Sequence, residues 1–229
     1  MSKPWTVAID GPAGAGKSTV ARLLAQRLGY LYIDSGAMYR AVALLTERNG
    51  ISQDNPDEVA ALARTARIEF VQDGDSQSPL VFLAGEDVTT DIRLPEVASL
   101  ASVISTIPGV RTALVAQQQV LGAQGGVVME GRDIGTVVFP NAEIKVFLTA
   151  SPEARAARRL HEIQSRGHLA ATLDEVRADQ DERDQRDATR AMAPLRPAVD
   201  AVVLDSDEIG PDQVVDEILK IVDARRREA

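Results

Sequence analysis

Short apolar runs alternate with longer helix-prone segments through the first 50 residues. Residues 5–10 and 31–33 are apolar and β-type, as the buried strands of a parallel sheet are. Residues 17–28 and 37–48 are rich in helix-forming residues, and Ser35 stands where the second of these helices needs an N-cap. This strand–helix–strand–helix order predicts right-handed βαβ units and therefore a parallel sheet.

The alternation breaks in the middle of the chain. A short helix is predicted from Asn55-Pro56 to about residue 66. Residues 68–71 and 80–83 are two β-type runs joined by a polar loop, and residues 85–88 follow closely. Together they predict a small antiparallel insertion at about 67–90. Excursions of this kind from an α/β domain commonly carry substrate-specific elements.

The second half of the chain returns to alternating helices and strands. Ser151 and Pro152 are typical of a helix start, as an N-cap and a first helical residue. We expect helices at 95–106, 108–121, 152–164, 172–190 and 211–226, and strands at 127–129, 144–148 and 201–204. The chain is thus predicted to be one α/β domain over residues 1–229, with a doubly wound, five-stranded parallel sheet. Ligands of such sheets bind beyond the carboxyl ends of the strands.

The turn after the first strand matches G-x-x-x-x-G-K-[ST], the P-loop pattern. Its glycines let the backbone curl so that N–H groups point inward, and these donors form a phosphate site with the helix N-terminus. Lys17 would reach the outer phosphates of a nucleotide, and Ser18 would offer its hydroxyl to Mg²⁺. The predicted contacts in this segment are Gly11, Pro12, Ala13, Gly14, Ala15, Gly16, Lys17, Ser18 and Thr19.

Composition narrows the class of protein. No cysteine is present among the 229 residues, which argues against disulfides and thiolate metal sites and fits a reducing compartment. No apolar run approaches the ~20 residues of a membrane span, so we expect a cytoplasmic protein without a membrane partner. A net charge of −9 argues against a nucleic-acid partner. Nearly all positive charge is arginine, and nine arginines lie between residues 151 and 196.

A P-loop alone does not distinguish a GTPase, an ATPase motor and a small kinase. No N-K-x-D stretch for reading guanine is present. The chain also carries a second set of arginines and small hydroxyl side chains, separate from the P-loop. Because the planar guanidinium group suits bidentate contact with phosphate, this second set predicts an acceptor that is itself phosphorylated.

Three inner motifs carry a family resemblance. They are D-S-G-A-M-Y-R at 34–40, E-G-R-D-I-G-T-V-V-F-P at 130–140 and E-R-D-Q-R-D-A-T-R-A-x-A-P-L at 182–195. With the P-loop, they resemble the bacterial cytidylate kinases of the long form, over nearly the whole chain. The resemblance implies ATP-dependent phosphorylation of CMP and dCMP. Two alternatives are another P-loop kinase, acting on UMP, AMP or a non-nucleotide alcohol, and a regulatory protein that uses ATP as a switch.

The resemblance also implies roles for individual residues. The acceptor nucleotide would contact Ser35, Tyr39, Arg40, Ser102, Arg111, Arg132, Asp133 and Asp187. Phosphates in transfer would be bound by Lys17, Arg132, Arg183 and Arg190, and ATP would also contact Arg155, Arg158 and Arg159. Spacing alone leaves other interpretations open. Arg132 and Asp133 suit a structural ion pair, Arg183 and Asp187 a surface pair at i, i+4, and Ser102 an ordinary helix surface.

The expected mechanism is in-line transfer dominated by alignment and electrostatics, without an essential general base. Mg²⁺ would be held mainly by nucleotide phosphates, Ser18 and water. We expect a lid at 155–168 to close over ATP, and an acceptor-binding region at 37–110 to move when the acceptor binds. One sheet and its helices account for the apolar content, so we expect a monomer.

Overall fold

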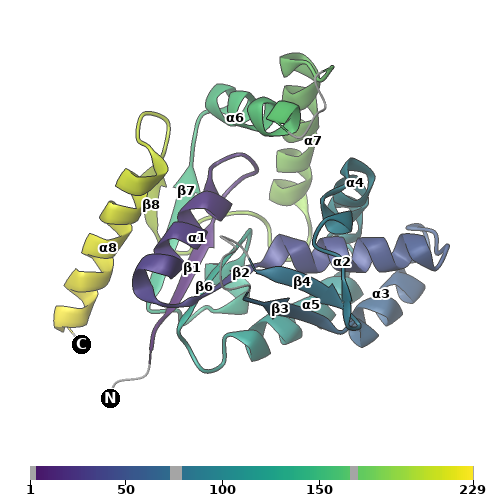
Figure 1. Cartoon of the computed structure of the whole chain (residues 1–229), viewed down its shortest axis with the longest axis horizontal. Helices are drawn as coiled ribbons and strands as arrows, with labels where there is room; N and C mark the ends of the chain where they lie inside the picture. Colours follow the sequence, from purple (N-terminus) through teal and green to yellow (C-terminus); the bar gives the residue numbers. More distant parts are fainter. Residues whose placement is uncertain (1–3, 73–78, 166–169, 229) are drawn as a thin grey trace.

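The computed structural model describes residues 4–72, 79–165 and 170–228 (Figure 1). Its centre is a sheet of five strands, all parallel, in the order β2-β6-β1-β7-β8. The strands are β1 Thr6–Asp10, β2 Leu31–Asp34, β6 Val127–Gly131, β7 Ile144–Thr149 and β8 Val202–Asp205. The predicted doubly wound sheet is confirmed, with the P-loop strand β1 at its middle.

Two apolar layers cover the faces of this sheet. Helices α1 Lys17–Leu28 and α8 Pro211–Glu228 pack on one face, and their apolar side chains form one core with those of β1 and β7. The other face packs against a short π-helical turn, Ile134–Val138, which the sequence pattern did not predict. Every residue of β1 is buried, as expected for a strand with a neighbour on each side.

A second group of elements lies to one side of the sheet and has its own core (Figure 1). Its helices are α2 Ser35–Arg48, α3 Pro56–Thr65, α4 Pro95–Ile104 and α5 Pro108–Leu121. Its strands, β3 Ile68–Val71, β4 Leu80–Leu83 and β5 Glu86–Asp87, form the predicted antiparallel sheet. Residues 73–78 of the predicted insertion lie outside the described residues.

One predicted helix cap is wrong. Helix α2 begins at Ser35, two residues earlier than expected, and its N-cap is Asp34, whose Oδ1 accepts from the backbone N–H of Ala37 at 3.1 Å. The Ser35 hydroxyl instead donates to the backbone oxygen of Glu130 at 2.6 Å. A nearby acceptor on β6 thus takes Ser35 away from the capping role that its sequence position indicates.

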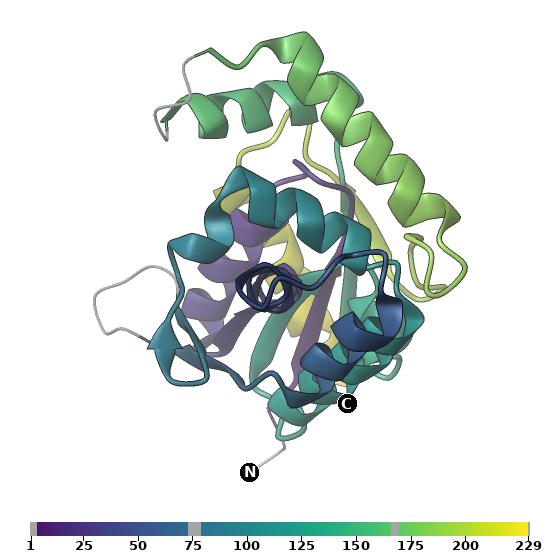
Figure 2. The ribbon, with the colours of Figure 1, turned by 90° about the vertical axis from the view of Figure 1, so that its right-hand side faces the viewer.

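Helices α6 Pro152–Ser165 and α7 Leu173–Thr189 lie beyond the carboxyl ends of the strands (Figures 1 and 2). We call them the lid helices. The Ser151 hydroxyl caps α6 by accepting from Ala154 at 3.2 Å, as predicted. Thr172 and Glu175 form a capping box at the start of α7. Residues 166–168 of the predicted lid lie outside the described residues.

Among the described helices, no single one has both the length and the apolar character to cross a membrane. The pair α4 and α5 meets those criteria only when joined, and it bends by 102° at its break.

Candidate active site

The P-loop leaves the buried strand β1 and enters α1. Gly14 and Gly16 have φ angles of 77° and 85°, in the left-handed region that residues with a Cβ rarely adopt. Lys17 is 5% exposed, and its Nζ donates to the backbone oxygen of Pro12 at 2.6 Å. Burial and the neighbouring Arg132 guanidinium lower the pKa of Lys17 to about 7. A nearby anion would therefore favour the protonated, positively charged form of Lys17.

Side chains of the lid helices contact the P-loop. Arg155 is buried, and its Nη1 donates to the backbone oxygen of Ala13 at 3.0 Å and to Asp184 of α7 at 2.5 Å. A Cβ added at Gly14 would lie 2.9 Å from Arg155 Cβ and 2.7 Å from Gln180 Nε2, so these side chains close over the loop. A basic residue predicted from sequence to contact ATP is thus bound to the loop's own backbone.

The three predicted lid arginines have different surroundings. Arg155 does not line the cavity described next, and neither does Arg158, which donates to Ser206 Oγ of the β8 loop at 2.9 Å. Arg159 does line the cavity, and it pairs with Glu162 on its own helix at 2.8 Å. Of the three, Arg159 has the placement that suits direct contact with a nucleotide.

One cavity of about 420 Å³ runs from the P-loop to helices α2, α4 and α5. Its lining includes the following residues predicted from sequence: Ala13, Gly14, Lys17, Ser18, Thr19, Ser35, Tyr39, Arg40, Ser102, Arg111, Arg132, Asp133, Arg159, Arg183, Asp187 and Arg190. Gly11, Pro12, Ala15 and Gly16 belong to the loop but not to this lining. Among the described residues, the predicted ATP contacts and the predicted acceptor contacts thus line the same cavity. We call these two groups of residues the two half-sites.

A buried carboxylate lines this cavity. Asp133 is 6% exposed; its Oδ2 accepts from Arg111 of α5, and Arg190 Nη2 lies 3.7 Å from its Oδ1. Burial raises the pKa of Asp133, although both arginines oppose the shift. The Arg111 guanidinium also lies over the Tyr39 ring, at 5.9 Å from its centroid. Tyr39 Oη is buried and has no hydrogen-bond partner among the described residues.

Arg132 and Asp187 form a second ion pair across the cavity. Arg132 Nε lies 2.8 Å from Asp187 Oδ2, joining the end of β6 to α7. Arg183 pairs with Asp179 at 3.2 Å. The structure thus contradicts two interpretations from spacing: Arg132 does not pair with its neighbour Asp133, and Arg183 does not pair with Asp187.

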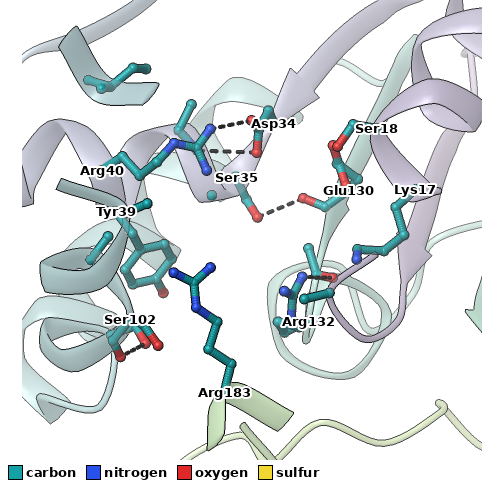
Figure 3. A pocket seen from close by; sticks show the side chains of 18 of the residues that line it. Lys17, Ser18, Asp34, Ser35, Tyr39, Arg40, Ser102, Glu130, Arg132 and Arg183 are labelled. Atoms are coloured by element: carbon teal, nitrogen blue, oxygen red, sulfur yellow. Dashed lines mark hydrogen bonds and ion pairs between the residues drawn. The ribbon is translucent and has the colours of Figure 1, made fainter. Parts of the chain in front are cut away.

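Figure 3 shows Lys17 and Arg132 on one side of the cavity and Tyr39 and Ser102 on the opposite side, with Arg183 of α7 entering between them. Ser102 lies on α4 and lines the cavity, although its helix has an ordinary sequence. Its position facing the cavity argues against the interpretation as a plain surface serine.

Three acidic residues of this region were not singled out from the sequence. Asp34 accepts from Arg40 Nη2 at 2.7 Å; burial alone would raise its pKa, but Arg40 outweighs burial and the pKa is lowered. Glu130 accepts from Tyr32 Oη at 2.8 Å and hydrogen-bonds Ser18, and burial raises its pKa. Burial also raises the pKa of Asp10 to about 6. Asp10 and Asp34 end strands of the parallel sheet and Glu130 is the last residue but one of its strand, and that position was the signal available in the sequence.

A phosphate-binding loop after the central strand, a doubly wound parallel sheet and lid helices beyond the strand ends define a P-loop kinase fold. A family model described as cytidylate kinase matches residues 7–224. The cytidylate kinase of Pelotomaculum thermopropionicum is 50% identical over 222 residues, covering 97% of each chain. That of Solibacter usitatus is 51% identical over 231 residues, covering 97% of this chain and 94% of the relative. The chain belongs to the cytidylate kinase family.

A solved structure of an uncharacterized protein from Eubacterium ventriosum superposes with a TM-score of 0.53, at 13% identity, covering 97% of this chain and 99% of that one. At this identity the likeness concerns the fold alone.

Proposed function

We propose that this protein transfers the γ-phosphoryl group of ATP to CMP or dCMP, giving ADP and CDP or dCDP. One observation carries the proposal beyond family membership. A single cavity joins the P-loop to a separate group of arginines around a buried carboxylate, Asp133. A kinase whose acceptor already carries a phosphate needs two anion-binding half-sites in one space.

The P-loop half would bind ATP. Lys17 would exchange its bond to the Pro12 backbone oxygen for the β- and γ-phosphates, and Arg159 would add a guanidinium from α6. Arg155 would contribute without facing the nucleotide, by holding the Ala13 carbonyl group outward.

The other half would bind the acceptor nucleotide. The Asp133 carboxylate, oriented by Arg111 and flanked by Arg190, suits acceptance of a hydrogen bond from the exocyclic amine of cytosine. Ser102 would add a hydroxyl group at the same end, and Asp187 would accept from the ribose.

Guanidinium groups on several elements would bind the acceptor phosphate. Arg40 lies on α2, Arg132 at the end of β6 and Arg183 on α7, and all three line the cavity. Ser35 and Tyr39 line it beside Arg40. The present carboxylate partners of Arg40 and Arg132 hold these side chains in place until a phosphate competes for them.

The residues present fit a bound Mg²⁺ that is held mainly by phosphates. The described residues contain no group of three or more histidine, cysteine or acidic side chains able to hold a metal ion. Ser18 lines the cavity with its hydroxyl, and Glu130 hydrogen-bonds that side chain. Hydroxyl, water and phosphate oxygens are the ligands that Mg²⁺ prefers. When bound, the ion would neutralise charge on the phosphates.

The chain's own groups would act by alignment and charge. The attacking oxygen belongs to the acceptor phosphate, mostly dianionic at pH 7 because its second pKa is about 6. It needs little deprotonation, so no side chain need act as general base. Lys17, Arg132, Arg183 and Arg190 would stabilise negative charge as the phosphoryl group passes between the two half-sites.

Water must be excluded while this transfer takes place. The lid helices face α4 across the cavity, and residues of both line it. We propose that the lid at 155–168 and the acceptor region at 37–110 approach each other when both nucleotides are bound. The monomeric state, the cytoplasmic location and the absence of nucleic-acid and membrane partners stay predictions.

An acceptor panel tests this proposal. ADP release from MgATP is measured with CMP, dCMP, UMP, AMP and shikimate, and a Lys17→Met variant serves as the blank. We expect CMP and dCMP to give the highest kcat/KM. Preference for UMP, AMP or shikimate would favour the alternative kinase, and tight ATP binding without CMP-stimulated ADP release would favour a nucleotide switch.

A further inference from the structure

Asp10 is a buried acid that the proposed mechanism leaves without a role. It is the last residue of β1 and directly precedes Gly11 of the P-loop, and it is 4% exposed. Its two carboxylate oxygens accept separate backbone hydrogen bonds. The nitrogen of Ile134 lies 2.7 Å from Oδ1, and that of Gly135 lies 2.8 Å from Oδ2. One carboxylate thus satisfies two consecutive buried N–H groups.

Those two N–H groups belong to the start of the π-helical turn, immediately after Arg132 and Asp133. Strand β6 ends at Gly131, which lies in register with Asp10 on β1. The P-loop follows Asp10 directly, and the segment with two proposed acceptor contacts, Arg132 and Asp133, follows Gly131 directly. Asp10 thus links the start of the P-loop to the segment that follows β6.

The backbone on each side of Asp10 is closely confined. A Cβ added at Gly11 would lie 2.0 Å from the backbone oxygen of Leu148, so the chain after Asp10 presses against β7. A Cβ added at Gly135 would lie 3.3 Å from Asp10 Oδ2 and 3.3 Å from Lys145 Cδ. The turn reaches the carboxylate this closely because residue 135 has no side chain.

We propose that Asp10 is a positioning residue for phosphoryl transfer, which fixes the turn that follows Arg132 and Asp133, and with it those two residues, relative to the P-loop bearing Lys17. The inference rests on the proposed function, because that function makes the turn an acceptor site. Transfer between two bound nucleotides depends on how their reacting atoms are aligned. A group that sets the separation of the two half-sites acts on the acceptor without touching it.

A purely structural role is the competing explanation, and the chain offers a matched control for it. Glu143 Oε2 accepts from the backbone N–H of Thr6, at the opposite end of β1, at 2.8 Å. Neither Glu143 nor Thr6 adjoins a cavity-lining residue in the chain, whereas Ile134 directly follows Asp133, which lines the cavity. The two acids thus make the same kind of contact with the central strand region, and only Asp10 makes it next to both half-sites.

The test compares Asp10→Asn with Glu143→Gln. The asparagine keeps one acceptor oxygen and replaces the other by an N–H donor, which cannot bind the facing amide. We expect KM for CMP to rise roughly tenfold or more, the effect of one lost hydrogen bond to a charged group. The Kd of MgATP, measured without CMP, should stay within about twofold of wild type, because the P-loop keeps its own contacts. Glu143→Gln should lower Tm without changing KM for CMP.

Gly135→Ala perturbs the same contact from the side of the turn and decides the matter if Asp10→Asn does not fold. It should raise KM for CMP in the same selective way. Wild-type protein without CMP-dependent ADP release would overturn the proposed function and the inference with it. With an active wild type, an unchanged KM for CMP in the variants overturns the inference alone. If KM for CMP and the Kd of MgATP rise equally, and Glu143→Gln shows the same change, Asp10 has a structural role and the inference is overturned as well.

Discussion

Lys17 allows a quantitative test of nucleotide binding by the P-loop. Burial and the positive charge of Arg132 lower its pKa from an ordinary 10.5 to about 7. Its nearest polar contact is the backbone oxygen of Pro12, at 2.6 Å. A bound triphosphate would place negative charge beside the ammonium group and raise the pKa back toward its ordinary value. Binding of ATP should therefore take up a proton at Lys17.

The size of the uptake follows from the pKa of the free protein. With a pKa of about 7, Lys17 is about half protonated at pH 7 and about one-tenth protonated at pH 8. If the bound form is fully protonated, uptake is about 0.5 proton per ATP at pH 7 and about 0.9 at pH 8. Affinity for ATP should also fall about tenfold per pH unit above pH 7, because protonation of Lys17 precedes tight binding.

Isothermal titration calorimetry measures this uptake directly. A non-hydrolysable ATP analogue with Mg²⁺ is titrated at each pH in two buffers of different ionisation enthalpy, and the difference in apparent enthalpy gives the number of protons. Lys17→Arg is the matched variant, since arginine stays protonated in both states. The variant should lose the uptake at pH 8.

Two results would refute this reasoning. Uptake near zero at both pH values would mean that Lys17 is already fully protonated in the free protein. The same uptake in Lys17→Arg as in wild type would assign the proton to another group, of which Asp10 is the first candidate because burial raises its pKa to about 6.

Three further predictions concern single residues of the cavity and its support. Lys17→Ala should abolish CMP-dependent ADP release, and near-wild-type turnover would contradict the P-loop assignment. Asp133→Ala should lower kcat/KM for CMP by about 5- to 160-fold, the value of about 1–3 kcal/mol for one base-edge contact, with little change in the Kd of ATP. A selective loss of ATP binding would place Asp133 on the donor side instead. Arg155→Gln should weaken ATP binding and lower Tm, because the partly buried partner Asp184 and the Ala13 carbonyl group lose a charged donor. Unchanged ATP affinity in a folded variant would contradict the support role.

Local pattern was sufficient for the elements of the fold. The strand before the P-loop, the helix after it and the other four strands were each predicted from runs of a few residues, and the structure confirms them. The antiparallel insertion followed from two β-type runs and a polar loop. Such features depend on the intrinsic preferences of neighbouring residues, and those preferences are present in the sequence itself.

Contacts between distant segments were not accessible in the same way. Arg132 pairs with Asp187, 55 positions away, and Asp10 binds amides 124 and 125 positions away. The sequence resemblance predicted that Arg155 lies on the lid and contacts ATP. In the structure, its guanidinium group donates to the backbone oxygen of Ala13 in the P-loop, 142 positions away.

Taken alone, the sequence determined that this chain folds as a parallel α/β domain with a phosphate-binding loop, and its motifs indicated the family. Tertiary structure decided which polar group each side chain binds. Asp34 rather than Ser35 caps α2, because folding brings the Glu130 backbone oxygen within 2.6 Å of the Ser35 hydroxyl. A helix or strand follows from residues that are neighbours in the chain, whereas a hydrogen-bond partner is chosen among all groups that packing brings within reach.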